Sequence, residues 1–404
     1  MIKEIQGGVC AAKGFTANGV HCGIRKNKTK RDLALIYSET QASAAAVYTQ
    51  NLVKGAPLTV TKNNIADGKA RAVICNSGNA NTCNANGIEI AEQTCALLAK
   101  ELKIDEKDVV VASTGVIGQP LDITPIASGI PALVAGLGVH SDLACEGIMT
   151  TDTQAKEIAF EFTVGGKTCR IGGIAKGSGM IHPNMATMLV FVTTDCAISS
   201  DMLAKALSAD VKDSFNMISV DGDTSTNDMV SVLANGMAGN AEITEDGEDF
   251  ENFCTALSAT TTYLCRKIAA DGEGATKLLE CKVTGAKDEQ TAKIVAKSVI
   301  CSSLVKAAMF GSDANWGRVL CAIGYSGADV DVNKVDVAFR SAKGTISVCK
   351  DGAGIEFSEE KAKEILLEKE IEVLISLHSG EGVAVAWGCD LTYDYVKING
   401  DYRT

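Results

Sequence analysis

The chain of 404 residues contains little histidine and little proline, with 4 histidines and 5 prolines. Because histidine is the commonest metal ligand in proteins, so few histidines argue against a histidine-rich metal centre, and we expect no metal. No apolar run approaches the roughly 20 residues that a membrane-spanning helix needs. The first residues also lack the apolar segment of a signal peptide. These absences predict a cytoplasmic protein.

Cysteine is abundant, but its spacing excludes the usual cysteine-based sites. The 15 cysteines are odd in number, and no two of them form a C-x-x-C pair. That spacing argues against both a zinc site and a disulfide framework. We therefore expect small buried thiols in a reducing compartment.

Positive charge is outweighed by negative charge, and the formal net charge is -12. Such a chain repels the phosphate backbone of nucleic acids, so we expect no nucleic-acid partner. The composition, 46% hydrophobic and 22% charged, is typical of a compact globular protein. The length predicts two or more packed subdomains or one large multi-layer domain, and no stretch has the composition of a free linker.

Apolar and polar residues alternate at the strand period in several segments. Two β-hairpins are predicted on this basis: residues 158–171 around Gly165-Gly166, and residues 345–357 around Asp351-Gly352, with strands at 345–348 and 355–357.

Apolar residues recur at helical spacing in two other segments, residues 87–102 and 294–309, and predict a helix in each. Glycine-rich turns are expected at residues 76–79, 113–115, 172–173 and 177–179. Strands and helices are thus mixed throughout the chain, which predicts an α/β or α+β layered fold.

Two motifs suggest ligands that the remaining sequence does not support. Gly166-Lys167-Thr168 resembles the end of a phosphate-binding loop, but the required first glycine is Glu161, whose carboxylate opposes phosphate. Clustered oxygen-bearing side chains in residues 221–228 suit a hard cation, but Val232 stands where a calcium loop has its glutamate. A polar loop of Asx turns is the favoured interpretation, with a cation site as the alternative.

The most informative segment is residues 176–192, in which a glycine-rich loop leads into an apolar strand beginning at Thr187. A threonine hydroxyl is a weak nucleophile until a base takes its proton. If the Thr187 hydroxyl attacks the Ala186 carbonyl, hydrolysis of the ester frees the α-amine of Thr187. That amine, with a typical pKa of about 7.7 to 8.0, suits a general base. The pattern has the arrangement that an N-terminal nucleophile needs, but the spacing alone does not establish one, because most threonines that open a buried strand only pack.

The sequence resembles the ornithine acetyltransferase family, also called the glutamate N-acetyltransferases, over essentially its whole length. The motifs that carry this resemblance are residues 113–118 (STGVIG), 149–153 (MTTDT), 176–189 (KGSGMIHPNMATML), 219–228 (SVDGDTSTND), 271–277 (DGEGATK), 313–318 (DANWGR), 386–392 (AWGCDLT) and 398–404 (INGDYRT).

The resemblance implies self-cleavage between Ala186 and Thr187, with Thr187 as the nucleophile. Residues 1–186 would then be an α chain and residues 187–404 a β chain, commonly assembled as a heterotetramer of two of each. Thr114 and Gly115 would form the oxyanion hole, because a hydroxyl and a backbone N–H can both donate to a tetrahedral intermediate. A helix-capping turn would explain the same local sequence.

The implied substrate contacts are Thr153, Lys176, Thr187, Glu273, Asn399 and Thr404. Their charges suit N-acetylornithine, since Lys176 can neutralise the carboxylate and Glu273 can pair with the side-chain ammonium. Without the resemblance, both charged residues would be interpreted as solvated loop residues.

The implied reaction moves acetyl from N2-acetyl-L-ornithine to L-glutamate through an acetyl-Thr187 intermediate and needs no cofactor. Some family members also accept acetyl from acetyl-CoA, and no residue in the sequence decides this point. The implied architecture is a layered α/β sandwich with a second, smaller α/β part. The alternatives are a self-processing aminopeptidase or amidase, which uses water as the acceptor, and a binding protein that keeps the fold without processing.

Overall fold

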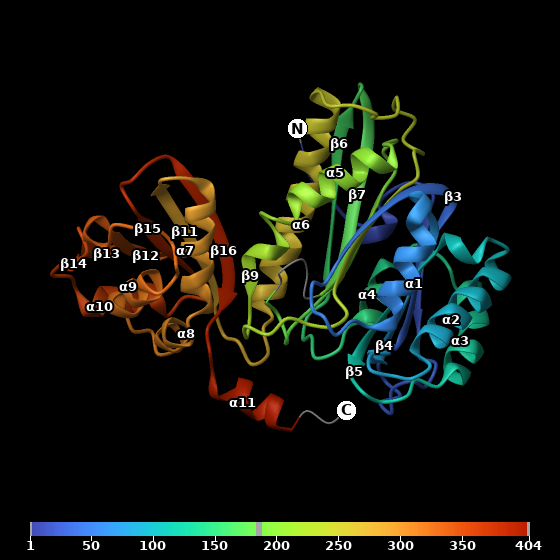
Figure 1. The fold of residues 1–404 in the computed structure, drawn as a ribbon, viewed down its shortest axis with the longest axis horizontal. Coiled ribbons are helices and arrows are strands. Elements are labelled where there is room, and N and C mark those ends of the chain that lie inside the picture. Colours follow the sequence, from blue (N-terminus) through green and yellow to red (C-terminus); the bar gives the residue numbers. More distant parts are fainter. Residues whose placement is uncertain (1, 183–187, 402–404) are drawn as a thin grey trace.

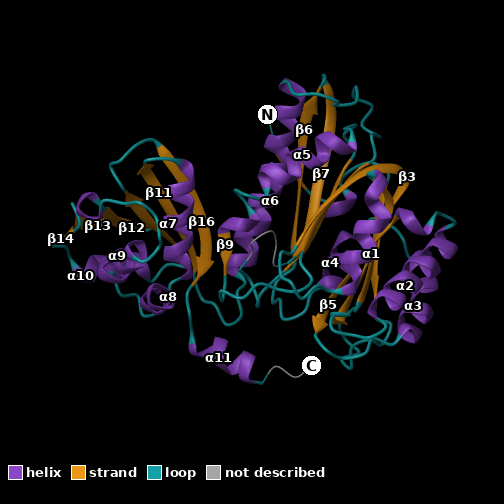
Figure 2. Cartoon of the chain, viewed as in Figure 1, coloured by secondary structure: helices purple, strands orange, loops and turns teal. Residues whose placement is uncertain are grey.

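A computed structural model describes residues 2–182 and 188–401. In Figures 1 and 2 the chain forms a larger part and a smaller part, each built on a β-sheet with helices packed against it. The predicted mixed α/β class is confirmed, and so is the layered architecture with a smaller second part.

The sheet of the larger part has nine strands among the described residues, in the order β1-β6-β7-β8-β10-β3-β4-β5, with β2 also paired to β3. The strands are β1 (Lys3–Ile5), β2 (Phe15–Val20), β3 (Leu33–Tyr48), β4 (Lys69–Asn79), β5 (Val109–Val116), β6 (Lys156–Val164), β7 (Lys167–Lys176), β8 (Leu189–Thr194) and β10 (Met229–Ala234).

Alternating side chains give this sheet two buried faces. In β4, Val73 and Cys75 belong to one hydrophobic cluster, whereas Ala72 and Ile74 belong to another. The first cluster packs on α4, the second on α2 and α3, and α1 supplies a residue to each. Farther along the sheet, α5 and α6 supply a third cluster. These helices are α1 (Ala56–Asn64), α2 (Gly87–Leu102), α3 (Ile123–Ala135), α4 (Ser141–Ile148), α5 (Ser200–Asp210) and α6 (Glu248–Ala270).

The smaller part has a seven-stranded sheet in the described residues, in the order β14-β13-β12-β15-β11-β16-β9. Its strands are β9 (Ile218–Ser219), β11 (Leu278–Ala286), β12 (Asp336–Ser341), β13 (Gly344–Lys350), β14 (Ala353–Gly354), β15 (Glu370–Ser376) and β16 (Gly382–Cys389). Its helices are α7 (Glu289–Cys301), α8 (Ser303–Phe310), α9 (Trp316–Gly324) and α10 (Glu359–Leu366), and α11 (Tyr393–Gly400) follows near the C-terminus.

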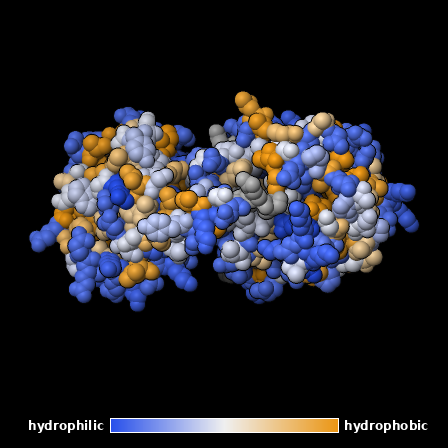
Figure 3. All heavy atoms as spheres, turned by 90° about the horizontal axis from the view of Figure 1, so that it is seen from below, coloured by the Kyte–Doolittle hydropathy of each residue, from blue (hydrophilic) through white to orange (hydrophobic). Residues whose placement is uncertain are grey.

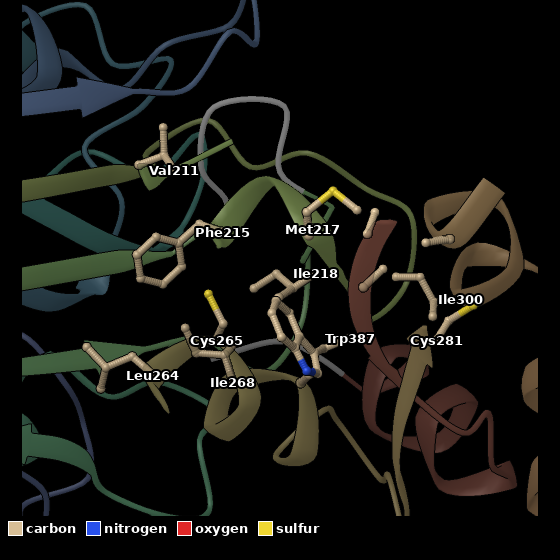
Figure 4. Close-up of a cluster of buried hydrophobic side chains, with 14 of the residues drawn as sticks. Val211, Phe215, Met217, Ile218, Leu264, Cys265, Ile268, Cys281, Ile300 and Trp387 are labelled. Atoms are coloured by element: carbon tan, nitrogen blue, oxygen red, sulfur yellow. The ribbon is translucent and has the colours of Figure 1, made fainter. Parts of the chain in front are cut away.

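One continuous hydrophobic cluster joins the two parts. Figure 4 shows Phe215 and Ile268 from the larger part close to Ile218 and Trp387 at the boundary, with Ile300 beyond them. Ile218 lies in β9, which leaves the larger part to pair in parallel with β16 at Trp387. The boundary is therefore packed, as the absence of a linker composition predicts.

Two of the four predicted segments have the expected structure. The hairpin around Gly165-Gly166 is formed by β6 and β7, and both glycines have positive φ angles. The helix predicted at residues 87–102 is α2.

The other two predictions need correction. Residues 294–309 do not form one helix, because Ser302 has an extended backbone and its hydroxyl caps α8 by accepting from Val305 N at 3.3 Å. In the second hairpin, β13 pairs with Ala353–Gly354 directly after the turn, and residues 355–357 are not a strand.

Three of the predicted glycine-rich turns are instead parts of strands: residues 76–79 end β4, residues 113–115 lie in β5 and residues 172–173 lie in β7. At one of these positions, glycine is required because another backbone segment lies very close. A Cβ on Gly172 would lie 1.9 Å from the carbonyl oxygen of Gly8. Glycine is needed there for space rather than for a turn.

The described helices include none with both the length and the apolar character that crossing a bilayer demands. Figure 3 shows the face seen from below, where hydrophilic side chains cover much of both parts. The cysteines are free thiols, and most of them are buried, in agreement with the sequence prediction. Burial raises the pKa of Cys75, for example, to about 12.

Candidate active site

A cavity of about 330 Å³ gathers residues that are far apart in the sequence. It lies where the ends of β4, β5 and β7 meet the loop after α6 and the C-terminal helix α11. Its lining consists of Ala80, Thr114, Gly115, Val116, Ile117, Thr150, Thr151, Lys176, Gly179, Met180, Ser225, Thr226, Asn227, Glu273 and Asn399. Five of the eight catalytic and substrate-binding residues predicted from the sequence are in this lining.

Lys176 and Glu273 bring opposite charges to the cavity. Lys176 is the last residue of β7 and Glu273 follows α6, and each side chain is buried apart from the part that faces the cavity. Within residues 2–182 and 188–401, no hydrogen bond or ion pair engages Lys176 Nζ. A buried, unpaired ammonium is costly, so this lysine is suited to an anionic ligand. The interpretation of both charges as solvated loop residues is therefore wrong.

Asn399 reaches the cavity from α11, and its Nδ2 donates to Glu273 Oε2 at 2.7 Å. This contact fixes the carboxylate from the C-terminal side. Of the two substrate contacts implied near the end of the chain, Asn399 lines the cavity and Thr404 lies outside the described residues.

Thr114 and Gly115 lie near the end of β5, on the cavity wall. Gly115 has a φ of 133°, and a Cβ there would lie 2.3 Å from the backbone of Gly78, so only glycine fits. Because these residues lie in a strand, the alternative of a helix-capping turn is wrong.

Thr153 lies beside the cavity rather than in its lining. Its hydroxyl and its N–H both donate to the carboxylate of Asp271, the N–H at 3.0 Å. Its neighbours Thr150 and Thr151 form the wall instead.

Residues 183–187, which include Ala186 and Thr187, lie outside the described residues, and hydrogen bonds hold the chain on both sides of them. On one side, Asp221 accepts from the N–H groups of Met180 and Ile181 at 2.6 and 2.8 Å. On the other, Met188 accepts from Met229 N at 3.0 Å. The next residue, Leu189, begins β8 opposite Lys176 in the neighbouring strand.

His182 also precedes this segment. Burial, reinforced by the positive charge of Lys297, lowers the pKa of His182 to about 4, so the ring is neutral near pH 7. Its Nδ1 lies 3.1 Å from Ser219 Oγ and 3.5 Å from Cys301 Sγ.

The roles of Thr226 and Asn227 in the site were not predicted from the sequence. Asn227 Oδ1 accepts from the hydroxyls of Thr82 and Thr226, both at 2.6 Å, and its Nδ2 donates to Ala80 O at 2.6 Å. The polar run at residues 221–228 was the available signal, but the sequence analysis interpreted it as a polar loop, with a cation site as the alternative. Among the residues described, no cluster of three or more His, Cys, Asp or Glu side chains could hold a metal.

A second, larger cavity of about 710 Å³ shares Gly115, Thr150 and Thr151 with the first. Its lining includes three cationic residues, Arg25, Lys26 and Lys30, and one acidic residue, Asp122. The buried carboxylate of Asp32 shapes this basic loop by accepting from the N–H groups of Cys22 and Arg25 at 2.6 and 3.0 Å.

Comparison with known proteins places these features in context. The model of the ArgJ family matches residues 16–404. The arginine biosynthesis bifunctional protein ArgJ of Caldanaerobacter subterraneus subsp. tengcongensis is 50% identical over 402 residues, covering 99% of either chain. Arginine biosynthesis bifunctional protein ArgJ 1 of Clostridium acetobutylicum is 51% identical over 392 residues, covering 96% of either chain. The crystal structure of arginine biosynthesis bifunctional protein ArgJ from Bacillus halodurans is 50% identical, with a TM-score of 0.51. It covers 54% of this chain and 100% of its own.

Proposed function

Since the chain belongs to the ArgJ family, we propose that it transfers acetyl from N2-acetyl-L-ornithine to L-glutamate through an acetyl ester on Thr187. The observation that carries this proposal is the cavity with an unpaired Lys176 ammonium and the Glu273 carboxylate. The donor is an amino acid with a carboxylate and a side-chain ammonium, and each charge meets its opposite in the lining.

The reaction has two steps of the same kind. The Thr187 hydroxyl attacks the acetamide carbonyl of N-acetylornithine, its proton passes through the Thr187 α-amine to the leaving nitrogen, and ornithine departs. The amine of glutamate then attacks the ester carbonyl, the C–O bond to Thr187 breaks, and the hydroxyl regains a proton. Such a sequence predicts ping-pong kinetics.

Each step passes through a tetrahedral oxyanion, for which we assign Thr114 and Gly115 as hydrogen-bond donors. Both residues line the cavity at the end of a strand fixed by pairing with β4. Donors that are held in place before reaction stabilise the transition state, and loss of one typically costs about 3 to 4 kcal/mol of barrier.

Self-cleavage between Ala186 and Thr187 would supply the free α-amine. The Bacillus halodurans chain is consistent with two products, because it aligns over its whole length with 54% of this chain. That share matches the share of the sequence from Thr187 to Thr404. We propose that residues 1–186 and 187–404 stay associated as α and β chains, in a heterotetramer of two of each, in the cytoplasm.

Intact mass spectrometry tests the nucleophile, the processing and the acceptor together. We expect two chains divided between Ala186 and Thr187, with one acetyl group on the Thr187 chain after brief exposure to N-acetylornithine. Glutamate should remove that group. A single uncut chain that takes no acetyl would contradict the proposal and favour a binding protein.

The rival aminopeptidase or amidase differs only in its acceptor. Water would then remove the acetyl group as fast without glutamate as with it. We expect release of acetyl from Thr187 to depend on glutamate concentration, and acetate formation at the same rate with and without glutamate would favour the hydrolase.

We also propose acetyl-CoA as a second acetyl donor, and the lining of the larger cavity supports this proposal. Three cationic residues line it although the chain carries a formal net charge of -12, and it shares Gly115, one of the two assigned oxyanion donors, with the smaller cavity. The phosphates of coenzyme A suit such a basic lining. Its volume is within the range of about 300 to 1,000 Å³ that is typical of ligand sites.

A double variant that reverses two charges of the larger cavity tests whether acetyl-CoA binds there. Lys26→Glu/Lys30→Glu should raise the KM for acetyl-CoA about tenfold or more and leave the KM for N-acetylornithine unchanged. Lys28→Glu is the matched control, because Lys28 is exposed in the same loop but is not in the cavity lining. Equal effects of the two changes would contradict the assignment of the cavity.

A further inference from the structure

Lys156 is a fully buried lysine that is not in the cavity lining and has no part in the reaction described above. Its Nζ lies 2.7 Å from Asp152 Oδ1 and 2.5 Å from Asp271 Oδ2. A buried ammonium is costly unless it is neutralised, and two carboxylates do so here. The pairing explains how Lys156 is tolerated but not why a charge is present at this place.

The two aspartates hold the segments that carry the charged residues of the cavity. Asp152 accepts from Gly177 N at 2.7 Å, next to Lys176 in the chain. The backbone carbonyl of Asp271 accepts from Ser178 Oγ at 2.7 Å, two residues before Glu273. Lys156 connects these two segments through its ion pairs with Asp152 and Asp271. Loss of Lys156 therefore affects the segment that carries Lys176 and the segment that carries Glu273.

Lys176 is a second cation whose charge acts on Asp152. Burial alone would raise the pKa of Asp152, but the charges of Lys176 and Lys156 hold that pKa below its usual range. Both oxygens of the Asp152 carboxylate already accept hydrogen bonds, from Lys156 and Gly177 on one side and from Thr150 N at 2.9 Å on the other. Lys176 Nζ, by contrast, is not bonded to any residue in the described ranges.

We propose that Lys156 is a positioning residue, which occupies Asp152 and so leaves the Lys176 ammonium available to the substrate carboxylate. Without Lys156, Asp152 is a buried carboxylate that lacks its ion-pair partner. Lys176 is then the remaining cation whose charge lowers the pKa of Asp152. Lys176 turns to Asp152, and the cavity loses its anion-binding group. The proposal deepens the function above and rests on it.

The test is a pair of variants measured on folded, processed enzyme. Lys156→Met should raise the KM for N-acetylornithine and for glutamate about tenfold or more, with a smaller change in kcat. Asp152→Asn/Lys156→Met removes the competing carboxylate and should return both KM values to within about threefold of the original enzyme. If the methionine variant does not fold, Lys156→Gln carries the same expectation.

Lys306→Met is the matched control for the loss of a buried lysine. Lys306 is also buried, and its Nζ donates to Cys389 O at 2.5 Å, away from the cavity lining. It should lower the melting temperature and leave both KM values unchanged.

A purely structural Lys156 would behave like Lys306, and unchanged KM values in Lys156→Met would overturn the inference. Failure of Asp152→Asn to restore them would do the same. If the unmodified enzyme transfers no acetyl from N-acetylornithine, the proposed function fails instead.

Discussion

At the scale of single residues, the charge of Lys176 can be tested directly by measuring the KM for N-acetylornithine. The ammonium lies at the cavity wall and makes no hydrogen bond or ion-pair contact with the described residues, although its charge acts on Asp152. A hydrogen bond to a charged group contributes about 1.5 to 3 kcal/mol, and 1.4 kcal/mol corresponds to a factor of ten. Lys176→Met should therefore raise the KM for N-acetylornithine about 10- to 100-fold.

The carboxamide analogue of N-acetylornithine is the control for this prediction, because it lacks the carboxylate. The original enzyme and Lys176→Met should have the same KM for the analogue. A variant that discriminates against the analogue as strongly as the original enzyme does would mean that Lys176 binds something else.

His182 gives a prediction about pH and stability. Burial depresses its pKa to about 4 in the folded protein, against 6.5 in an unfolded chain. Between these values the unfolded chain binds a proton that the folded protein does not, so acid favours unfolding. The contribution of His182 to the free energy of unfolding is present above pH 6.5 and is lost as the pH falls toward 4.

Urea denaturation of the original protein and of His182→Asn, at several pH values, measures this contribution. The stability difference between the two should shrink as the pH falls from 6.5 to 4. Asp210, whose pKa burial raises to about 6, acts in the opposite direction but is present in both proteins and cancels. A difference that does not change with pH would contradict the assigned pKa.

The sequence identifies which residues form the site more readily than it predicts their burial and their contacts. Lys176 and Glu273 were found through the resemblance, but their burial depends on β7 and on the loop after α6, which are brought together only by folding. Lys156 gives no local signal at all. Its two partners lie 4 and 115 positions away, and only the folded chain shows that one ammonium serves both.

At the scale of secondary structure, Ser302 shows why one helix prediction failed. The apolar spacing of residues 294–309 continues through Ser302, since α7 and α8 both face the core, and periodicity does not detect a cap. Ser302→Ala removes the acceptor for Val305 N and should lower the free energy of unfolding by about 1 kcal/mol. Urea denaturation measures this loss, and Ser303→Ala, at the exposed next position, should cost much less.

The C-terminal helix α11 is expected to serve the site more than the fold. It contains no buried residue, yet its Asn399 side chain bonds to Glu273. Deleting residues 399–404 should therefore lower turnover about tenfold or more while the melting temperature changes little. Asn399→Ala separates the side chain from the rest of the deletion. Full turnover in the truncated enzyme would contradict a role for this segment.

At the scale of the whole molecule, the two parts are coupled through their core. The sequence predicts a packed boundary only because no stretch has the composition of a linker. The structural element that joins the two parts is β9, a strand of two residues that pairs with β16. So short a segment has no periodicity to recognise, and its partner in the sheet is distant in sequence.

Ile218→Ala tests whether this boundary makes the molecule one cooperative unit. Ile218 is fully buried between the parts, and truncation of such a residue to alanine typically costs about 2 to 5 kcal/mol. Trp316 and Trp387 both lie in the smaller part, so tryptophan fluorescence reports on that part while circular dichroism reports on both. We expect the two transitions to coincide in the original protein and to move together in the variant. If fluorescence alone shifts, the smaller part unfolds independently, and the shared cluster does not couple the two parts.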